Sequence, residues 1–230
     1  MTGRPLLLIG TGGLAREVVA LVTALNQGSP AWRLIGLLDD DPQRHGRTVA
    51  GLPVLGPPEL ARDAYPDAAL ALCTASPADR SSRYRLARRL GLPTDRYPPL
   101  VHPAAVLAPS TAVEPGVVVL AGTVTTADVI IGAHTVLMPA CVLTHDDVVD
   151  AFATLASGAR LGGGVRVGTG AYVGAAAAVR EDCRLGEWCV VGMGSVVLRD
   201  VPAFETWWGT PARRQRAELR AGAAAPLGEV

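Results

Sequence analysis

The second half of the chain repeats its hydrophobic pattern every six residues. From residue 101 to residue 197, sixteen of the seventeen positions at this spacing carry Val, Leu or Ile, and the exception is Thr125. A period of six is neither the 3.6-residue period of an α-helix nor the simple alternation of a strand. It predicts one short strand and one tight corner per repeat, with three repeats closing a triangular coil of about 18 residues.

Small residues and glycines occupy fixed places in the same repeat. The position four residues after each aliphatic one is mostly Ala, Thr or Ser, and the position directly after it is often Gly (Gly132, Gly162, Gly168, Gly174, Gly186 and Gly192). We expect aliphatic side chains at the axis, small ones near the corners, and glycine where a corner needs a backbone conformation that other residues resist. Residues 101–202 then form about five to six stacked coils, each bonded to the next.

The first half predicts a small α/β unit. A strand is expected at residues 5–9, a glycine turn at 10–13, a helix at 14–22 and strands at 33–38 and 68–74. A basic helix at 77–90 and a proline-rich hinge at 93–103 follow. The predicted organisation is a Rossmann-like substrate-binding unit at 1–98, a β-helix at 99–202, and a C-terminal loop and frayed tail at 203–230.

The glycine turn of the first unit has the features of an anion site. Free N–H groups at a helix N-terminus favour an anion, which makes Gly10, Gly12 and Gly13 candidate substrate-binding residues. Asp39 and Asp40 follow the second strand, where an acidic residue can bind a ribose hydroxyl. The full GxGxxG pattern is absent, so the glycine turn could equally serve only to pack the helix on the strand. Likewise, Asp39 and Asp40 could equally belong to a solvent-exposed turn. The unit has room for one mononucleotide half, which favours a nucleoside diphosphate over NAD.

Charge and composition exclude several classes of protein. The 21 Lys and Arg residues balance 21 Asp and Glu residues, which gives no electrostatic reason to bind nucleic acid or an anionic membrane. No run of about 18 uncharged apolar residues exists, which excludes a membrane span. The first residues do not suit a signal peptide. The four cysteines (Cys73, Cys141, Cys183 and Cys189) lack metal-ligand spacing and are expected to be reduced core residues of a cytoplasmic protein.

Five segments together resemble a known family. They are the early glycine turn, LLDDDP, PPLVHPAAVLAPSTAVEPGVVV, LTHDD, and SVVLRDVPAFETWWGTPARR. In this combination the chain resembles the sialic-acid O-acetyltransferases and nucleotide amino-sugar N-acetyltransferases, which are hexapeptide-repeat acyltransferases with a left-handed β-helix. The hand comes from the resemblance alone, because parallel crossovers are normally right-handed. The resemblance implies a homotrimer, acetyl-CoA as donor, and an active site between neighbouring β-helices, and no metal is expected.

The resemblance also implies a catalytic pair of His145 and Asp146. A histidine titrates in the range where it can accept the proton of an attacking amine or hydroxyl, and a neighbouring carboxylate can orient the ring. His145 lies two places after Leu143, which puts it on an outer face or corner. The alternative is a surface histidine without a role.

Two other histidines compete for this role. His102 and His134 lack an adjacent acid, and His134 is expected at a corner of its repeat. A zinc site of the kind found in trimeric β-helix carbonic anhydrases is disfavoured, because the three histidines would lie on different coils.

Donor binding is expected along exposed backbone and small side chains. Under the resemblance, the candidate CoA-binding residues are Thr154, Gly163, Gly174, Gly192, Met193 and Arg213, with Arg214 next to it. A guanidinium can bind CoA phosphates, although a solvated basic tail explains both arginines as well.

Three departures from the family leave the acceptor open. Thr154 stands where a second histidine is common, Leu14 stands where the glycine turn often has one, and Thr74–Ala75–Ser76 replaces a glycine–asparagine pair. We therefore expect acetyl transfer to an amino or hydroxyl group of a sugar, with a nucleotide-linked sugar favoured. The alternative is a non-catalytic β-helix protein that binds a nucleotide-sugar or organises a biosynthetic assembly.

Overall fold

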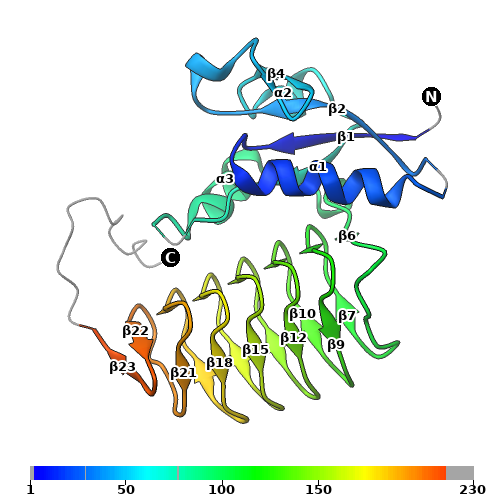
Figure 1. Ribbon diagram of the computed structural model, residues 1–230. Coiled ribbons are helices and arrows are strands. Elements are labelled where there is room, and N and C mark those ends of the chain that lie inside the picture. The colour runs from blue at the N-terminus through cyan, green and yellow to red at the C-terminus, as the bar shows by residue number, and fades with distance from the viewer. Residues whose placement is uncertain (1–2, 29, 77, 216–230) are drawn as a thin grey trace.

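The chain forms an α/β unit that lies against one side of a triangular β-helix (Figure 1). The computed structural model describes residues 3–28, 30–76 and 78–215. No helix among these residues is long and apolar enough to cross a membrane. The C-terminal tail expected from the sequence lies, from residue 216 onward, outside the described part of the chain.

A five-stranded sheet in the order β3-β4-β2-β1-β5 is the base of the α/β unit. β1, β2, β4 and β5 are parallel, and β3 pairs antiparallel with β4 at the edge. The predicted strands β1, β2 and β5 are found within two residues of their expected ends, whereas β3 and β4 were not predicted. The strands are β1 (Arg4–Ile9), β2 (Trp32–Leu38), β3 (Thr48–Val49), β4 (Leu52–Gly56) and β5 (Ala69–Leu72).

Helices cover both faces of this sheet because its strands are apolar on both. Leu6 and Leu8 of β1 pack with α1 (Gly13–Leu25), while Leu7 and Ile9 point to the opposite side. That side is covered by α2 (Leu60–Asp63) and α3 (Ser82–Leu90), and two short 3-10 turns, η1 (Pro42–Arg44) and η2 (Thr94–Arg96), complete the unit. The helix expected at 77–90 begins only at Ser82 in the structure, and residue 77 lies outside the described part.

Three flat faces form the β-helix, and up to residue 197 they are built of two-residue strands that pair in parallel with strands 18 residues away on the same face. Face 1 comprises β6 (Leu100–Val101), β8 (Val118–Val119), β11 (Val136–Leu137), β14 (Thr154–Leu155), β17 (Tyr172–Val173), β20 (Val190–Val191), β22 (Thr206–Gly209) and β23 (Ala212–Arg214). Face 2 comprises β9 (Val124–Thr125), β12 (Val142–Leu143), β15 (Arg160–Leu161), β18 (Ala178–Val179) and β21 (Val196–Val197). Face 3 comprises β7 (Ala112–Val113), β10 (Ile130–Ile131), β13 (Val148–Val149), β16 (Arg166–Val167) and β19 (Arg184–Leu185).

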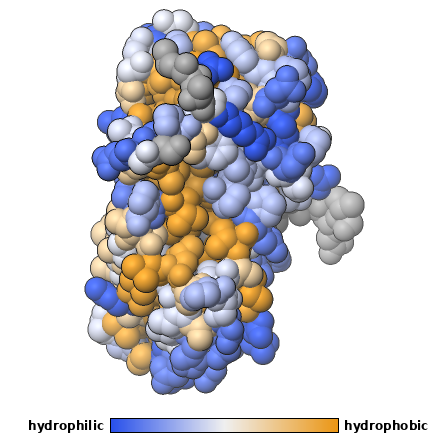
Figure 2. Space-filling model, turned by 90° about the vertical axis from the view of Figure 1, so that its right-hand side faces the viewer, coloured by the Kyte–Doolittle hydropathy of each residue, from blue (hydrophilic) through white to orange (hydrophobic). Residues whose placement is uncertain are grey.

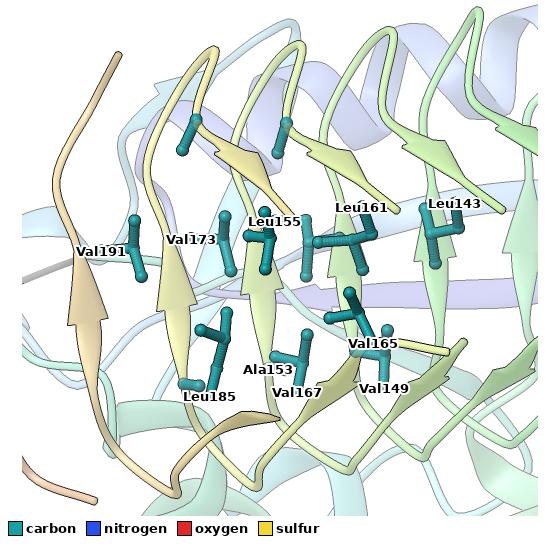
Figure 3. Close-up of a cluster of buried hydrophobic side chains, with 14 of the residues drawn as sticks. Leu143, Val149, Ala153, Leu155, Leu161, Val165, Val167, Val173, Leu185 and Val191 are labelled. Carbon is teal, nitrogen blue, oxygen red and sulfur yellow. The ribbon is translucent and has the colours of Figure 1, made fainter. Parts of the chain in front are cut away.

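The aliphatic series predicted from the sequence lines the interior of the β-helix. Every member from Val119 to Val197 is buried, and Figure 3 shows side chains from all three faces meeting at the axis. Val101, Leu107 and Val113 are only half-buried, because no coil precedes the first one. On the side of the molecule shown in Figure 2, apolar surface runs from the α/β unit onto the β-helix. The repeat-based prediction of stacked triangular coils is confirmed.

Glycine serves a different purpose in the repeat from the one expected. Positive φ angles recur every six residues from Gly116 to Gly194, at a position that also holds Asp, His, Ala, Phe and Trp. The glycines that follow the aliphatic position do not share this conformation. Instead, a Cβ at Gly162, Gly168 or Gly174 would lie only 2.5–2.6 Å from a backbone nitrogen of the next coil. These glycines therefore allow close stacking of coils.

The two halves share one core rather than meeting at a hinge. The outward residues Leu100, Val118 and Val136 of face 1 are buried against α1. The segment expected as a proline-rich hinge already contains β6, which pairs with β8 inside the β-helix. Leu100, within that segment, is fully buried. The expected hinge is thus a packed junction, because alternate residues of face 1 are apolar on both sides of the sheet.

Candidate functional site

His145 lies on the corner between faces 2 and 3, in the turn that joins β12 to β13. Its Nδ1 is 2.8 Å from Asp146 Oδ2, and its side chain is 68% exposed. The left-handed conformation of Asp146, with φ of 63°, bends the turn outward at this point. With the Nδ1 proton donated to the carboxylate, Nε2 is left as an acceptor at the surface, beside Gly163 of the next coil. The predicted outward position of the pair is thus observed.

Two features tune and place the imidazole of His145. The hydrogen bond that His145 donates to Asp146 raises the pKa of His145, and the negative charges of Asp146, Asp147 and Asp182 act in the same direction. The ring rests on Gly163 of the next coil, where a Cβ would lie 2.3 Å from Cε1 and 2.4 Å from Nε2. Gly163 therefore leaves the space that the imidazole fills.

The competing histidines have structural surroundings. His102 Nδ1 accepts a hydrogen bond from the Ala104 amide at 3.0 Å and so caps the first turn. His134 is buried, stacks on Phe152 with ring centroids 5.0 Å apart, and meets Tyr97 edge-on. Burial, followed by the charge of Arg83, lowers the pKa of His134 to about 4, so it stays neutral at physiological pH.

The three histidines occupy three different corners of the β-helix, as the turns after β6, β10 and β12 show. Among the residues that the structure describes, no group of three or more His, Cys, Asp or Glu side chains could hold a metal ion. The four cysteines are buried and unpaired. Burial raises the pKa of Cys73, Cys141 and Cys189 to about 12, which keeps these thiols protonated.

A cavity of about 350 Å³ lies where the α/β unit meets face 1. Its upper wall comes from Gly13 and Leu14 after β1 and from Ala75 after β5. β1 and β5 are neighbours, and the strand order reverses there, which is where open α/β sheets bind ligands. The lower wall comes from face 1 and from the corner between faces 1 and 2. Its residues are Met138, Thr154, Ala156, Ser157, Tyr172 and Ala175, with Glu17 of α1 at the side.

Arg83 of α3 joins the two walls of this cavity. Its side chain is buried, and its guanidinium donates to the carbonyl oxygens of Thr74, His134, Phe152 and Ala153. A further hydrogen bond of 2.7 Å reaches Thr154 Oγ1. Burial lowers the pKa of Arg83 to about 10, so it remains charged at pH 7. The cluster of carbonyl oxygens compensates a buried cation and holds β14 at a set distance from the segment after β5.

The candidate substrate-binding residues have divided roles. Gly10, with φ of 109°, packs on the backbone of Cys73, while Gly13 lines the cavity and Gly12 precedes α1 in open space. Asp39 is mostly buried, accepts hydrogen bonds from Thr11 Oγ1 and the Asp41 amide, and pairs with Arg44. Asp40 forms an exposed ion pair with Arg89 at 2.6 Å.

The candidate donor-binding residues are not brought together within one chain. Gly163 lies beside His145, between faces 2 and 3, whereas Gly174, Gly192 and Met193 lie between faces 1 and 2 on the side of the cavity. Met193 is 80% exposed. Thr154 lies in the cavity, bonded to Arg83.

The two arginines near the C-terminus also differ. Arg213 is exposed and donates to the carbonyl oxygen of Ala212, while Arg214 pairs with Glu205.

Sequence reasoning missed Glu17, Tyr172 and Arg83. Tyr172 is 18 residues from Thr154 on the same face, so the repeat register alone could have placed both side chains in one wall. Burial raises the pKa of Glu17 and of Tyr172. No feature of the sequence indicated that Arg83 is buried, because the basic helix contains several arginines and no local pattern shows which of them points inward.

Known proteins with a similar sequence or structure support the two-part fold described above. Residues 5–75 match the PglD N-terminal domain. Comparison with curated proteins gives no significant match. The acetyltransferase domain of PglB from Neisseria gonorrhoeae, solved with acetyl coenzyme A, has a TM-score of 0.81 and 28% identity, covering 93% of this chain and 100% of that chain.

Two further solved structures are similar. A variant of GDP-perosamine N-acetyltransferase from Caulobacter crescentus, solved with CoA and GDP-perosamine, has a TM-score of 0.80 and 29% identity, covering 94% of this chain and 98% of that chain. WeeI from Acinetobacter baumannii shares the fold, with a TM-score of 0.76, 24% identity, and coverage of 92% and 100%. The fold is therefore a Rossmann-like unit followed by a left-handed β-helix. The resemblance to the nucleotide amino-sugar acetyltransferases of the hexapeptide-repeat family is thereby confirmed, and with it the enzyme class of an acyltransferase.

Proposed function

We propose that this protein transfers the acetyl group of acetyl-CoA to an amino group of a nucleotide-linked sugar, with His145 as general base. The observation that carries the proposal is the exposed His145–Asp146 pair, seated on Gly163. It occurs in a chain that matches the PglB acetyltransferase domain and a GDP-perosamine N-acetyltransferase over more than nine tenths of its length. Transfer to nitrogen is favoured over transfer to oxygen, because the matched perosamine enzyme is an N-acetyltransferase.

The chemistry follows from the free acceptor nitrogen of His145. The acceptor amine attacks the thioester carbonyl carbon, so that a C–N bond forms and the C–S bond then breaks. Nε2 takes the proton that the amine loses, and returns it to the departing CoA sulfur. Asp146 holds the Nδ1 proton and stabilises the imidazolium that exists between these two transfers.

The position of the cavity argues for a site shared between two copies. In one chain, His145 lies between faces 2 and 3, whereas the cavity opens between face 1 and the α/β unit. Face 2 separates them. We propose that the cavity of one copy holds the acceptor and that a neighbouring copy in a homotrimer supplies His145.

The donor would lie along the corner between faces 1 and 2. Exposed Met193 and Trp208 offer apolar contact there, above the closely stacked Gly174 and Gly192, and Arg213 has a guanidinium without a carboxylate partner among the described residues. This set fits the chemistry of CoA, which combines an amide-containing arm with phosphates. The acceptor nucleotide would lie near Gly13 at the N-terminus of α1, with Asp39 held in place beside it.

The first test measures CoA thiol release with UDP-, dTDP- and GDP-linked amino sugars. Replacing His145 by Ala should lower kcat by a factor of about 10² to 10⁴ with little change in KM, since a general base contributes about this much. The matched control is His102→Ala, which removes a turn-capping imidazole and should leave kcat within about twofold. Equal turnover by wild type and the His145→Ala variant would show that His145 is not the base.

Calorimetry with acetyl-CoA separates this proposal from a non-catalytic scaffold. The proposal expects saturable binding that weakens when Arg213 is replaced by Ala. Absence of binding at millimolar acetyl-CoA would favour a protein that only binds a sugar nucleotide or organises an assembly.

A further inference from the structure

The turn that carries His145 contains a buried carboxylate where other turns have small or apolar side chains. From Val117 to Ser195, the same place in each repeat is filled by Val, Thr, Cys, Ala or Ser, except at Asp147. Like the others, Asp147 is fully buried. A buried carboxylate is costly unless it is well bonded. Packing alone therefore does not explain why this turn contains a carboxylate.

Asp147 reorganises the backbone hydrogen bonds of its turn. Its Oδ2 accepts from the Thr144 amide and its Oδ1 from the Val165 amide, both at 2.8 Å. In the corresponding turns the first amide instead donates to a carbonyl one coil further on, as Asp150 does to Val167 and Gly162 to Val179. Here the Thr144 hydroxyl replaces that bond by donating to Leu161 at 3.1 Å. The pairing of β12 with β15 is correspondingly limited to Val142 and Arg160.

The two amides that donate to Asp147 belong to the two turns that place the His145 ring. Thr144 directly precedes His145, and Val165 follows the Gly163 on which the ring rests. The carbonyl oxygen of His145 accepts from the Gly164 amide at 2.8 Å, which adds a third tie between these turns. Burial raises the pKa of Asp147 to about 6, although both amides and His145 oppose the shift, so the carboxylate is mainly ionised at pH 7.

We propose that Asp147 is a positioning residue, whose buried carboxylate locks the turn of His145 onto the coil of Gly163 and so sets where the imidazole stands. The inference rests on the proposed role of His145 as base. Without the carboxylate, the Thr144 amide would return to the carbonyl of Leu161, as in the other turns. The turn would then take the ordinary form of the repeat, and Nε2 would move relative to a substrate bound by another copy.

The test uses two substitutions of Asp147 and a charge-matched control. Asp147→Ala introduces the residue found at this place in four other turns (Ala153, Ala159, Ala171 and Ala177), so the β-helix should still fold. Asp147→Asn keeps the volume but replaces one acceptor by a donor. Asp182→Asn removes an exposed carboxylate that also acts on His145 but does not bond this turn.

Kinetics and amide exchange should separate these variants. For both Asp147 variants we expect kcat to fall by a factor of about 10 to 100, because a displacement of about 1 Å has this effect. KM for both substrates should stay within about twofold, since no group that binds substrate is removed. Amide hydrogen exchange at Thr144 and Val165 should accelerate. The Asp182→Asn variant should keep the wild-type kcat plateau and exchange rates.

Several results would overturn the inference. If exchange accelerates while kcat is unchanged, the carboxylate closes the turn without positioning the base. If kcat falls only in proportion to a loss of folded protein, or if neither Asp147 variant folds, its role is stability alone. Failure of the proposed function would look different: the His145→Ala variant would remain active, while exchange at Thr144 and Val165 would still report on the turn.

Discussion

At the scale of single residues, the surroundings of a histidine decide what it can do. His145 is exposed, has a carboxylate on Nδ1, and has a raised pKa. His134 is enclosed by Phe152 and Tyr97, and its pKa is lowered to about 4. The first can take up a proton near neutral pH, and the second cannot. The adjacent acid in the sequence therefore marks the histidine that is exposed and has a raised pKa, and its role as the base stays a prediction.

The Asp146 carboxylate should control the pH dependence of the reaction. A base must be neutral to accept a proton, so kcat/KM should rise with pH through the pKa of His145, which lies above 6.5. Asp146→Asn removes the first cause of that raised pKa. The acid limb should therefore move to lower pH, and the plateau should fall by about tenfold or more, because the imidazolium loses its partner. The measurement is a pH profile of both proteins with one acceptor.

A matched control for that profile is Asp182→Asn, which removes a more distant charge and should move the limb less than Asp146→Asn does. An acid limb with an unchanged midpoint in the Asp146→Asn variant would contradict the assignment of His145 as the titrating base.

At the scale of the repeat, two glycine positions obey different constraints. One lies at the corner, where φ is positive and where Asp128, Asp146 and Asp182 are also accepted. The other follows the aliphatic residue, where the next coil leaves no room for a Cβ. The glycine pattern seen in the sequence belongs to the second position. The reason we expected for it, a special backbone conformation, applies to the first position instead.

Substitution by Asn should distinguish these two positions. Gly122 has φ of 72°, and a Cβ there would make only ordinary contacts of 3.8–3.9 Å with Ala140, so Gly122→Asn should change the free energy of unfolding by less than about 1 kcal/mol. At Gly168 a Cβ would lie 2.6 Å from the Glu187 amide nitrogen, so Gly168→Asn should lower that free energy by about 3 kcal/mol. Denaturant unfolding of both variants tests this. Similar losses in the two would show that backbone conformation, rather than coil spacing, selects glycine at both.

The repeat predicted far more of the β-helix than of the junction. A six-residue period places each side chain inward, outward or at a corner, and Val119 to Val197 followed it throughout. The junction depends on contacts between distant segments, such as Arg83 with Thr154 and α1 with Val136. No local sequence pattern encodes such pairs. The repeat register could have placed Tyr172 beside Thr154 on face 1, but the cavity could be identified only from the three-dimensional structure.

At the scale of the whole molecule, the parts of the site lie on different sides of one chain. The α/β unit and face 1 are joined by a shared core and by buried Arg83, so both walls of the cavity belong to the same chain. His145 lies across face 2 from that cavity. Our central claim is therefore that neither half of the site works without another copy of the chain.

Mixed oligomers test that claim most directly. His145→Ala removes the base but keeps the cavity, while Ser157→Trp places a bulky side chain at an exposed position of the cavity wall and keeps His145. Each variant alone should be nearly inactive. Oligomers assembled from an equal mixture should regain about one quarter of wild-type activity, the share of random neighbours that pair an intact cavity with an intact histidine. Mixed oligomers no more active than the separate variants would contradict the account.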